Sequence, residues 1–154
     1  MNQSANPELR TPSSFVTFRL SRLQNSLNAQ AIAVLKSQAG LSLVEWRLIQ
    51  ILRIYGNASL TEVAGHMQMD KGQLSRKSKG MIAKGLLRAE TDKHDHRVHH
   101  LYLTEKAQAL SKRMMPVMEA RQNLLLADVS AEELEIFYSV VDKLEAASKA
   151  RVMK

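Results

Sequence analysis

The sequence predicts a mostly α-helical protein with one β-hairpin in its second half. Apolar residues recur at three- and four-residue steps over most of the chain, the period of helices that bury one face. This period lapses between about residues 87 and 103, where two short apolar segments flank a polar, turn-forming stretch at 92–97. A chain of 154 residues with 45% apolar content suffices for one domain with helical extensions.

Composition restricts the classes of function. Lys and Arg outnumber Asp and Glu by 22 to 15, so we expect a polyanionic partner such as a nucleic acid. The absence of cysteine excludes disulfides, thiolate zinc sites and thiol-based redox switches. No apolar run approaches the roughly 20 residues of a membrane helix, and the N-terminus has no signal-peptide core. We therefore expect a cytoplasmic protein without membrane contact.

The first helix is predicted to follow a polar N-terminus, residues 1–13, which we expect to be flexible. One apolar stripe marks this helix, which ends near Gly40. Its members are Val16, Leu20, Leu23, Leu27, Ala31 and Val34.

Three later helix starts share the pattern Ser-x-x-Glu, in which the serine oxygen accepts a free amide and the glutamate reaches back to the cap. The pairs are Ser42 with Glu45, Ser59 with Glu62, and Ser130 with Glu133. The helix after Ser42 is apolar on most sides and ends at Gly56, so we expect it to be central and buried.

The middle of the chain predicts a helix-turn-helix followed by a hairpin. A short helix covers about 60–67, and Asp70 caps a second helix that runs to Lys84, with Gly85 beyond its end. The hairpin strands are expected at 87–91 and 98–103. This order is typical of a winged helix-turn-helix, here residues 42–103, with a two-stranded β wing.

Two further helices close the chain, from Thr104 to about Ala127 and from Ala131 to about Ala150, and Pro116 should kink or interrupt the first of them. Together with the first helix they carry more apolar surface than the middle of the chain can cover. We therefore expect residues 14–40 and 104–154 to form a dimerisation region and the protein to be a homodimer.

The second helix of the helix-turn-helix has an unusual charge pattern. Residues 71–88 contain six basic residues and no acidic one. A solvated helix face normally mixes both signs, so this pattern favours a face that contacts DNA over one that is merely basic.

Four motifs in this region resemble the MarR (multiple antibiotic resistance regulator) family in order and spacing. They are Leu60-Thr61-Glu62-Val63-Ala64, residues 69–76, residues 81–86, and Asp95-His96-Arg97 with Leu103-Thr104-Glu105-Lys106 downstream. The resemblance implies a dimeric transcriptional regulator bound to a pseudo-palindromic double-stranded operator. It further implies a repressor released by a small ligand, aromatic acids being common in the family.

The sequence departs from the family pattern at five positions. Lys77 and Ser78 stand where apolar residues are usual, and Gly80 replaces a polar helix former. His96 stands in place of a second arginine, and Ala107 in place of a glycine. We expect either looser packing of the second helix or an extension of the DNA surface by Lys77.

Gln73 and Arg76 are the candidates for reading bases, because a glutamine amide pairs with adenine and a guanidinium with guanine. Contact of both with phosphate or water alone is the alternative. The phosphate anchors are expected to be Lys71, Ser75, Lys77 and Lys79. Ser59 and Thr61, at a helix N-terminus, either present amides to a phosphate or only cap the helix.

Arg97, at the hairpin tip, is the candidate for the minor groove, because narrow A·T-rich grooves attract arginine. Asp95 would repel DNA, so we expect it to hold the tip together. The nearby His94, His96, His99 and His100 leave open a metal-responsive regulator, against the simpler reading of polar wing residues.

A ligand pocket near Trp46 and Arg47 is a further expectation, with one residue to stack and the other to pair a carboxylate. The alternatives are that Trp46 belongs to the core and Arg47 to the dimer. No catalytic constellation stands out, so we expect neither an enzyme nor a cofactor or bound metal. A non-specific architectural nucleic-acid-binding protein remains the rival class.

Overall fold

The computed structural model describes residues 14–150. The N-terminal segment 1–13, which the sequence predicts to be flexible, lies outside the described residues. The described elements are α1 (Val16–Ala39), α2 (Leu43–Tyr55), β1 (Asn57–Ser59), α3 (Leu60–Met67), α4 (Lys71–Ala83), β2 (Leu87–Thr91), β3 (His99–Leu103), α5 (Glu105–Leu125) and α6 (Ala131–Ala150). They form two compact units that divide between Met114 and Met115. None of the described helices is long and apolar enough to cross a membrane.

The helix boundaries follow from their caps, and the three predicted capping boxes are confirmed. At each box the serine amide donates to the glutamate carboxylate over 2.7–2.8 Å, and the glutamate amide donates to the serine hydroxyl over 3.1–3.3 Å. At the other end of α1, Gly40 adopts a left-handed φ of 62° and donates to carbonyls of the last turn. Local chemistry alone therefore sets most of these boundaries.

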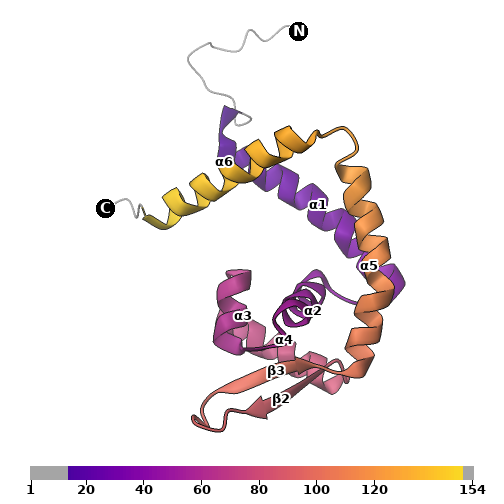
Figure 1. Cartoon of the computed structure of the whole chain (residues 1–154), viewed down its shortest axis with the longest axis vertical. Coiled ribbons are helices and arrows are strands. Elements are labelled where there is room, and N and C mark those ends of the chain that lie inside the picture. Colours follow the sequence, from indigo (N-terminus) through magenta and orange to yellow (C-terminus); the bar gives the residue numbers. More distant parts are fainter. Residues whose placement is uncertain (1–13, 151–154) are drawn as a thin grey trace, which may run out of the picture. The chain divides into compact units, whose positions relative to one another are not determined.

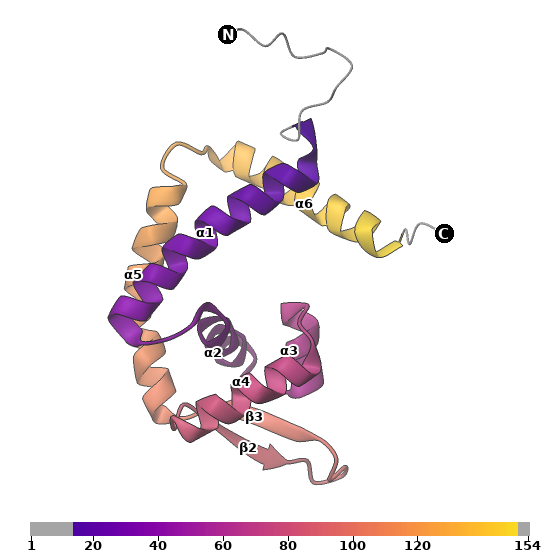
Figure 2. The same ribbon diagram turned by 180° about the vertical axis from the view of Figure 1, so that it is seen from behind.

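The core of the first unit gathers around α2, which α3, α4 and the β2–β3 hairpin surround in both views (Figures 1 and 2). Its fully buried side chains come from several elements: Leu48, Ile49, Leu52, Val63, Leu74, Met81 and Leu101. The prediction of a central, buried α2 holds for its first three turns. Its last turn leaves the core, because Ile54 is 67% exposed and Tyr55 is also exposed.

The predicted hairpin is confirmed, and a third strand joins it. The sheet is antiparallel with the order β1-β3-β2, and Leu101 of β3 lies opposite Ala58 on one side and Ala89 on the other. The sequence did not predict β1, because three residues are too few to show an alternating pattern. Val98, assigned to the second strand by the sequence, instead belongs to the tip, where its amide donates to the Asp95 carbonyl.

Pro116 lies inside α5, which continues on both sides of it, so the interruption that the sequence allowed does not occur. In the second unit, Ser130 caps α6, which contains no buried residue. Leu134 and Val141 are half-buried, and the remaining apolar side chains of α6 are exposed.

Candidate DNA-binding site

The turn between α3 and α4 comprises residues 68–70. Gln68 adopts the left-handed conformation at φ 48° and ends α3. Asp70 then begins α4, since its Oδ1 accepts the Gln73 amide at 2.9 Å. This short turn and the side-chain cap by Asp70 fix where α4 starts and which face it presents.

One face of α4 is buried and the other is open. Leu74, Ser78 and Met81 face the core, each at most 3% exposed. Ser78 occupies its buried position by donating its hydroxyl to the Ser75 carbonyl at 3.0 Å, so the polar group is satisfied. The candidate DNA contacts on the open face are Lys71, Gln73, Arg76, Lys77 and Lys79, all exposed, and the candidate Ser75 is half-buried.

The six basic residues of 71–88 fall into two groups. Lys84 pairs with the buried Glu45 at 2.6 Å, and Arg88 pairs with Glu90 and stacks over the Tyr102 ring. In the described part of the chain, the other four form no ion pair: Lys71, Arg76, Lys77 and Lys79. The uncompensated charge of this stretch is therefore concentrated on α4.

Lys84 holds the end of α4 to α2 through the Glu45 carboxylate. Burial opposes ionisation of Glu45, but the hydrogen bonds from Lys84 and Ser42 outweigh it and lower its pKa. A buried carboxylate that accepts from both partners stays charged at neutral pH, so this pair joins the start of α2 to the end of α4.

Ser59 caps α3 through its amide and its hydroxyl oxygen. Its amide donates to the Glu62 carboxylate and its hydroxyl accepts the Glu62 amide, and these bonds lower the pKa of Glu62. The amide of Ser59 itself is therefore committed to the cap. Thr61, in the first turn of α3, is exposed.

The hairpin tip is organised by two aspartates. Asp92 Oδ1 accepts the amides of His94 and Asp95 at 2.8 and 2.9 Å, and its Oδ2 lies 3.1 Å from His100 Nε2. These bonds lower the pKa of Asp92 to about 2. Asp95 Oδ1 accepts the Arg97 amide at 2.9 Å, which is the structural role expected of it.

Arg97 is consequently presented on an ordered loop, with an exposed side chain. The role of Asp92 was not among the predictions from the sequence. An aspartate at the first position of a loop, where its side chain bonds amides two and three residues on, is the signal that would have found it.

The wing histidines do not converge. His100 faces Asp92, and His99 Nδ1 lies 3.3 Å from Thr91 Oγ1. Over residues 14–150, no group of three or more His, Asp and Glu side chains is placed to hold a metal ion.

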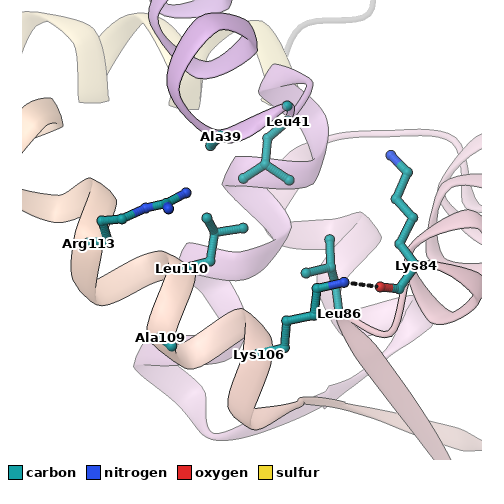
Figure 3. A pocket seen from close by; sticks show the side chains of 9 residues that line it. Ala39, Leu41, Lys84, Leu86, Lys106, Ala109, Leu110 and Arg113 are labelled. Atoms are coloured by element: carbon teal, nitrogen blue, oxygen red, sulfur yellow. Dashed lines mark hydrogen bonds between the residues drawn. The ribbon is translucent and has the colours of Figure 1, made fainter.

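The two candidate ligand residues lie apart from the cavity beside α5. Trp46 is buried in the core at 6% exposure, and Arg47 donates to Asn28 Oδ1 of α1 at 3.1 Å. A cavity of about 560 Å³ lies elsewhere in the same unit (Figure 3). Its lining comprises Ala39, Gly40, Leu41, Lys84, Leu86, Lys106, Ala109, Leu110 and Arg113.

A helix-turn-helix whose second helix is open and basic, followed by an antiparallel hairpin with an arginine at its tip, defines a winged helix-turn-helix protein. Residues 41–99 match the model of the MarR family. This segment is therefore a MarR-family domain, and the resemblance carried by its four motifs is confirmed.

Solved structures share this fold over nearly the whole chain. A MarR/EmrR family transcriptional regulator from Acinetobacter sp. ADP1 superposes with a TM-score of 0.85 at 21% identity, covering 92% of this chain and 100% of that one. A MarR-family transcriptional regulator from Silicibacter pomeroyi gives 0.76 at 24% identity, with 94% and 95% covered. The MepR–DNA complex of S. aureus gives 0.78 at 18% identity, with 86% and 98% covered. The predicted mostly helical winged fold is thus confirmed.

Proposed function

We propose that this protein is a sequence-specific, DNA-binding transcriptional regulator that acts as a homodimer and represses until a small ligand releases it. The observation that carries the proposal is the open face of α4, where Lys71, Arg76, Lys77 and Lys79 have no ion-pair partner among the described residues. A cationic helix face of this kind, held on a compact lobe, suits the major groove. The structure of MepR with DNA supports the proposal by fold.

Within this function we assign the base-reading role to Gln73 and Arg76. Both are exposed and lie three residues apart on α4, which places them on neighbouring parts of one helix face. Lys71, Ser75, Lys77 and Lys79 surround them and are assigned to the phosphates. Thr61 at the start of α3 and Arg97 at the hairpin tip extend the contact surface to either side.

The homodimer is supported by apolar surface that the chain leaves open. In α1, Val16, Phe18, Leu23 and Ile32 are each more than 40% exposed. In α6, Ile136 is 65% and Tyr138 51% exposed. Patches of this kind normally mark an interface, and we expect one that buries upwards of about 2,000 Å² as in obligate dimers.

The test measures binding to DNA selected from a random pool, across several salt concentrations. The wild-type dimer is expected to select a pseudo-palindrome with half-sites about 34–36 Å apart. Arg76→Ala should relax the preference at one base pair per half-site and cost about 1–3 kcal/mol. Lys79→Ala should weaken binding to all sequences alike, and Lys112→Ala, an exposed lysine on α5, is the control.

Two results would count against the proposal. Loss of affinity in both variants without a change of preference would refute the division between base readers and anchors. Selectivity that disappears as salt rises would favour the rival, a non-specific architectural protein. Repression is tested separately, by a reporter promoter that carries the selected operator and becomes more active when the protein is absent.

A further inference from the structure

The hairpin tip, residues 92–98, carries permanent charges that cancel. It contains two aspartates and two permanent cations: Asp92, Asp95, Lys93 and Arg97. Its remaining ionisable side chains are His94 and His96. A histidine ring is the side chain whose charge ordinarily changes between about pH 5 and pH 8. The net charge of the tip therefore depends on whether these two rings are protonated.

The negative charges of the tip are held by hydrogen bonds within the hairpin. Asp92 accepts two amides of the tip and lies 3.1 Å from His100 Nε2, and Asp95 accepts the Arg97 amide. Because the backbone bonds lower the pKa of Asp92 to about 2, its carboxylate stays ionised throughout the range in which histidine titrates. The aspartates thus contribute a constant negative charge, and only the histidines can change the balance.

His94 and His96 are the exposed and unengaged histidines of this region. Over residues 14–150, neither side chain forms a hydrogen bond or an ion pair. By contrast, His99 and His100 each contact another side chain of the hairpin. The first two rings can therefore bind a group from outside the chain, and they lie one and three positions from Arg97.

The charged groups of the neighbouring elements are engaged elsewhere. On β2, Arg88 pairs with Glu90. On α3, Glu62 belongs to the helix cap and interacts electrostatically with His100 and His66, and the His66 ring stacks on an aromatic ring of α2. Within the described part of the chain, these elements supply no carboxylate that pairs with either tip histidine.

We propose that His94 and His96 are proton-dependent phosphate-binding residues, so that the hairpin tip binds DNA more tightly as the pH falls. This inference rests on the proposed function, because it requires the tip to lie against DNA. An imidazolium is positively charged and donates from both ring nitrogens, so a phosphate binds it more strongly than it binds a neutral imidazole. Protonation of both rings changes the net charge of the tip from zero to +2 in each protomer.

The open face of α4 does not share this dependence. Its unpaired cations are three lysines and one arginine: Lys71, Arg76, Lys77 and Lys79. Lysine and arginine keep their charge over the range in which histidine titrates. A change of pH should therefore alter the contribution of the tip while that of α4 stays constant.

The test measures the affinity of the full chain for its selected duplex by fluorescence anisotropy between about pH 8 and pH 5.5. The wild-type affinity should rise about tenfold or more as the pH falls, because each protonated ring adds a charge-assisted hydrogen bond. The salt dependence should become steeper, by about one counterion for each histidine that binds a phosphate. The double variant His94→Gln with His96→Gln should lose most of both effects. His66→Gln, a histidine variant outside the hairpin, is the matched control and should keep them.

His96→Arg tests whether charge is responsible. A guanidinium is charged over the whole range, so this variant should bind several-fold more tightly than the wild type at about pH 8 and depend less on pH. Calorimetric titration in buffers of different ionisation enthalpy should show that the wild type takes up protons when it binds DNA and that the double variant takes up fewer. All substituted side chains are exposed, so circular dichroism should show every variant folded.

The outcomes separate this inference from the proposed function. DNA affinity that does not change with pH, or a rise that persists in the double variant, would refute the inference and leave the proposed function intact. Binding by His96→Arg that is no tighter than that of the wild type at about pH 8 would refute the phosphate contact of His96. A chain that binds no DNA at any pH would refute both.

Discussion

The two compact units of this chain bury their apolar side chains to very different extents. In the first unit, Leu48, Ile49 and Leu74 are 0% exposed and belong to one core. In the second, α6 has no buried residue, and Leu124 and Ile136 are 79% and 65% exposed. Both units have helices of the same amphipathic type, so the difference lies in what each helix can pack against within one chain.

This contrast indicates a division of roles. A lobe with its own core holds α4 and the hairpin in fixed positions, as DNA reading requires. Helices that expose Phe137 and Tyr138 gain most of their stability from burial against another surface. We expect α2, α3, α4 and the hairpin to be insensitive to assembly with a second copy, and α1 and the second unit to be sensitive to it.

Truncation in the core should produce the largest effect. Leu48→Ala should lower the free energy of unfolding by about 2–5 kcal/mol, because it removes fully buried methyl groups and leaves a cavity. Ile54→Ala, at a site 67% exposed on α2 and outside the expected dimerisation region, is the control and should change it by less than about 0.5 kcal/mol. Urea unfolding at fixed protein concentration measures both. Equal losses of unfolding free energy would show that burial around α2 does not account for the stability of the first unit.

A negative charge introduced on the apolar face of α6 should weaken dimerisation. Phe137→Glu should weaken the dimer by roughly 2–4 kcal/mol, because a carboxylate would lose its solvation in an apolar interface. Sedimentation velocity over a range of protein concentrations measures it, and Glu135→Gln on the same helix is the control. A wild-type chain that stays monomeric at micromolar concentration would show that these helices are not an interface.

The hairpin tip differs from both sets of helices, because side-chain hydrogen bonds hold it rather than apolar packing. Asp92→Ala should disorder the tip and displace Arg97, and so lower DNA affinity although a negative charge is lost. Asp95→Ala should act in the same direction. Arg97→Ala should reduce DNA affinity most for operators with A·T-rich flanks, and should lower the salt dependence of binding by about one counterion per protomer. Tighter DNA binding by either aspartate variant would show that the carboxylate only repels DNA.

The same bonds give the tip a dependence on pH. The pKa of Asp92 falls from its ordinary value of 3.8 to about 2 in the folded tip. The ionised Asp92 carboxylate therefore stabilises the tip fully above pH 3.8, and this stabilisation is lost as the pH falls through about 2. Amide signals of His94 and Asp95 in NMR spectra should keep their folded positions down to about pH 4, and Asp92→Ala should abolish those positions at neutral pH.

The smallest effect is expected at Gly80. A Cβ there meets open space, so Gly80→Ala should stabilise α4 by up to about 1 kcal/mol. Gly85→Ala is the contrasting variant, because Gly85 has a left-handed φ of 70° that favours glycine. Thermal unfolding should therefore shift in opposite directions for the two. If Gly80→Ala also weakens DNA binding, the backbone of α4 approaches DNA closely at this position.

The sequence predicted the elements that depend on neighbouring residues. Ser42, Ser59 and Ser130 cap their helices as expected, and Asp70 caps α4. These capping hydrogen bonds join residues three positions apart, so a four-residue sequence pattern includes both the donor and the acceptor. The exposed basic face of α4 was predictable for the same reason, because helical spacing assigns each residue to a face.

The tertiary structure alone determined the features that join residues distant in the sequence: an ion pair, a short strand and a cavity. Only the fold pairs Lys84 with Glu45, 39 positions away, and so removes one of the six basic residues from the candidate DNA surface. It also adds β1, which is too short to show a pattern, and brings the ends of α1 and α4 beside Lys106 and Arg113 around one cavity. Capping hydrogen bonds and helical periodicity depend on residues that are neighbours in the sequence, so a short segment of sequence predicts them. The ion pair and the cavity depend on packing between segments that are distant in the sequence, so no short segment predicts them.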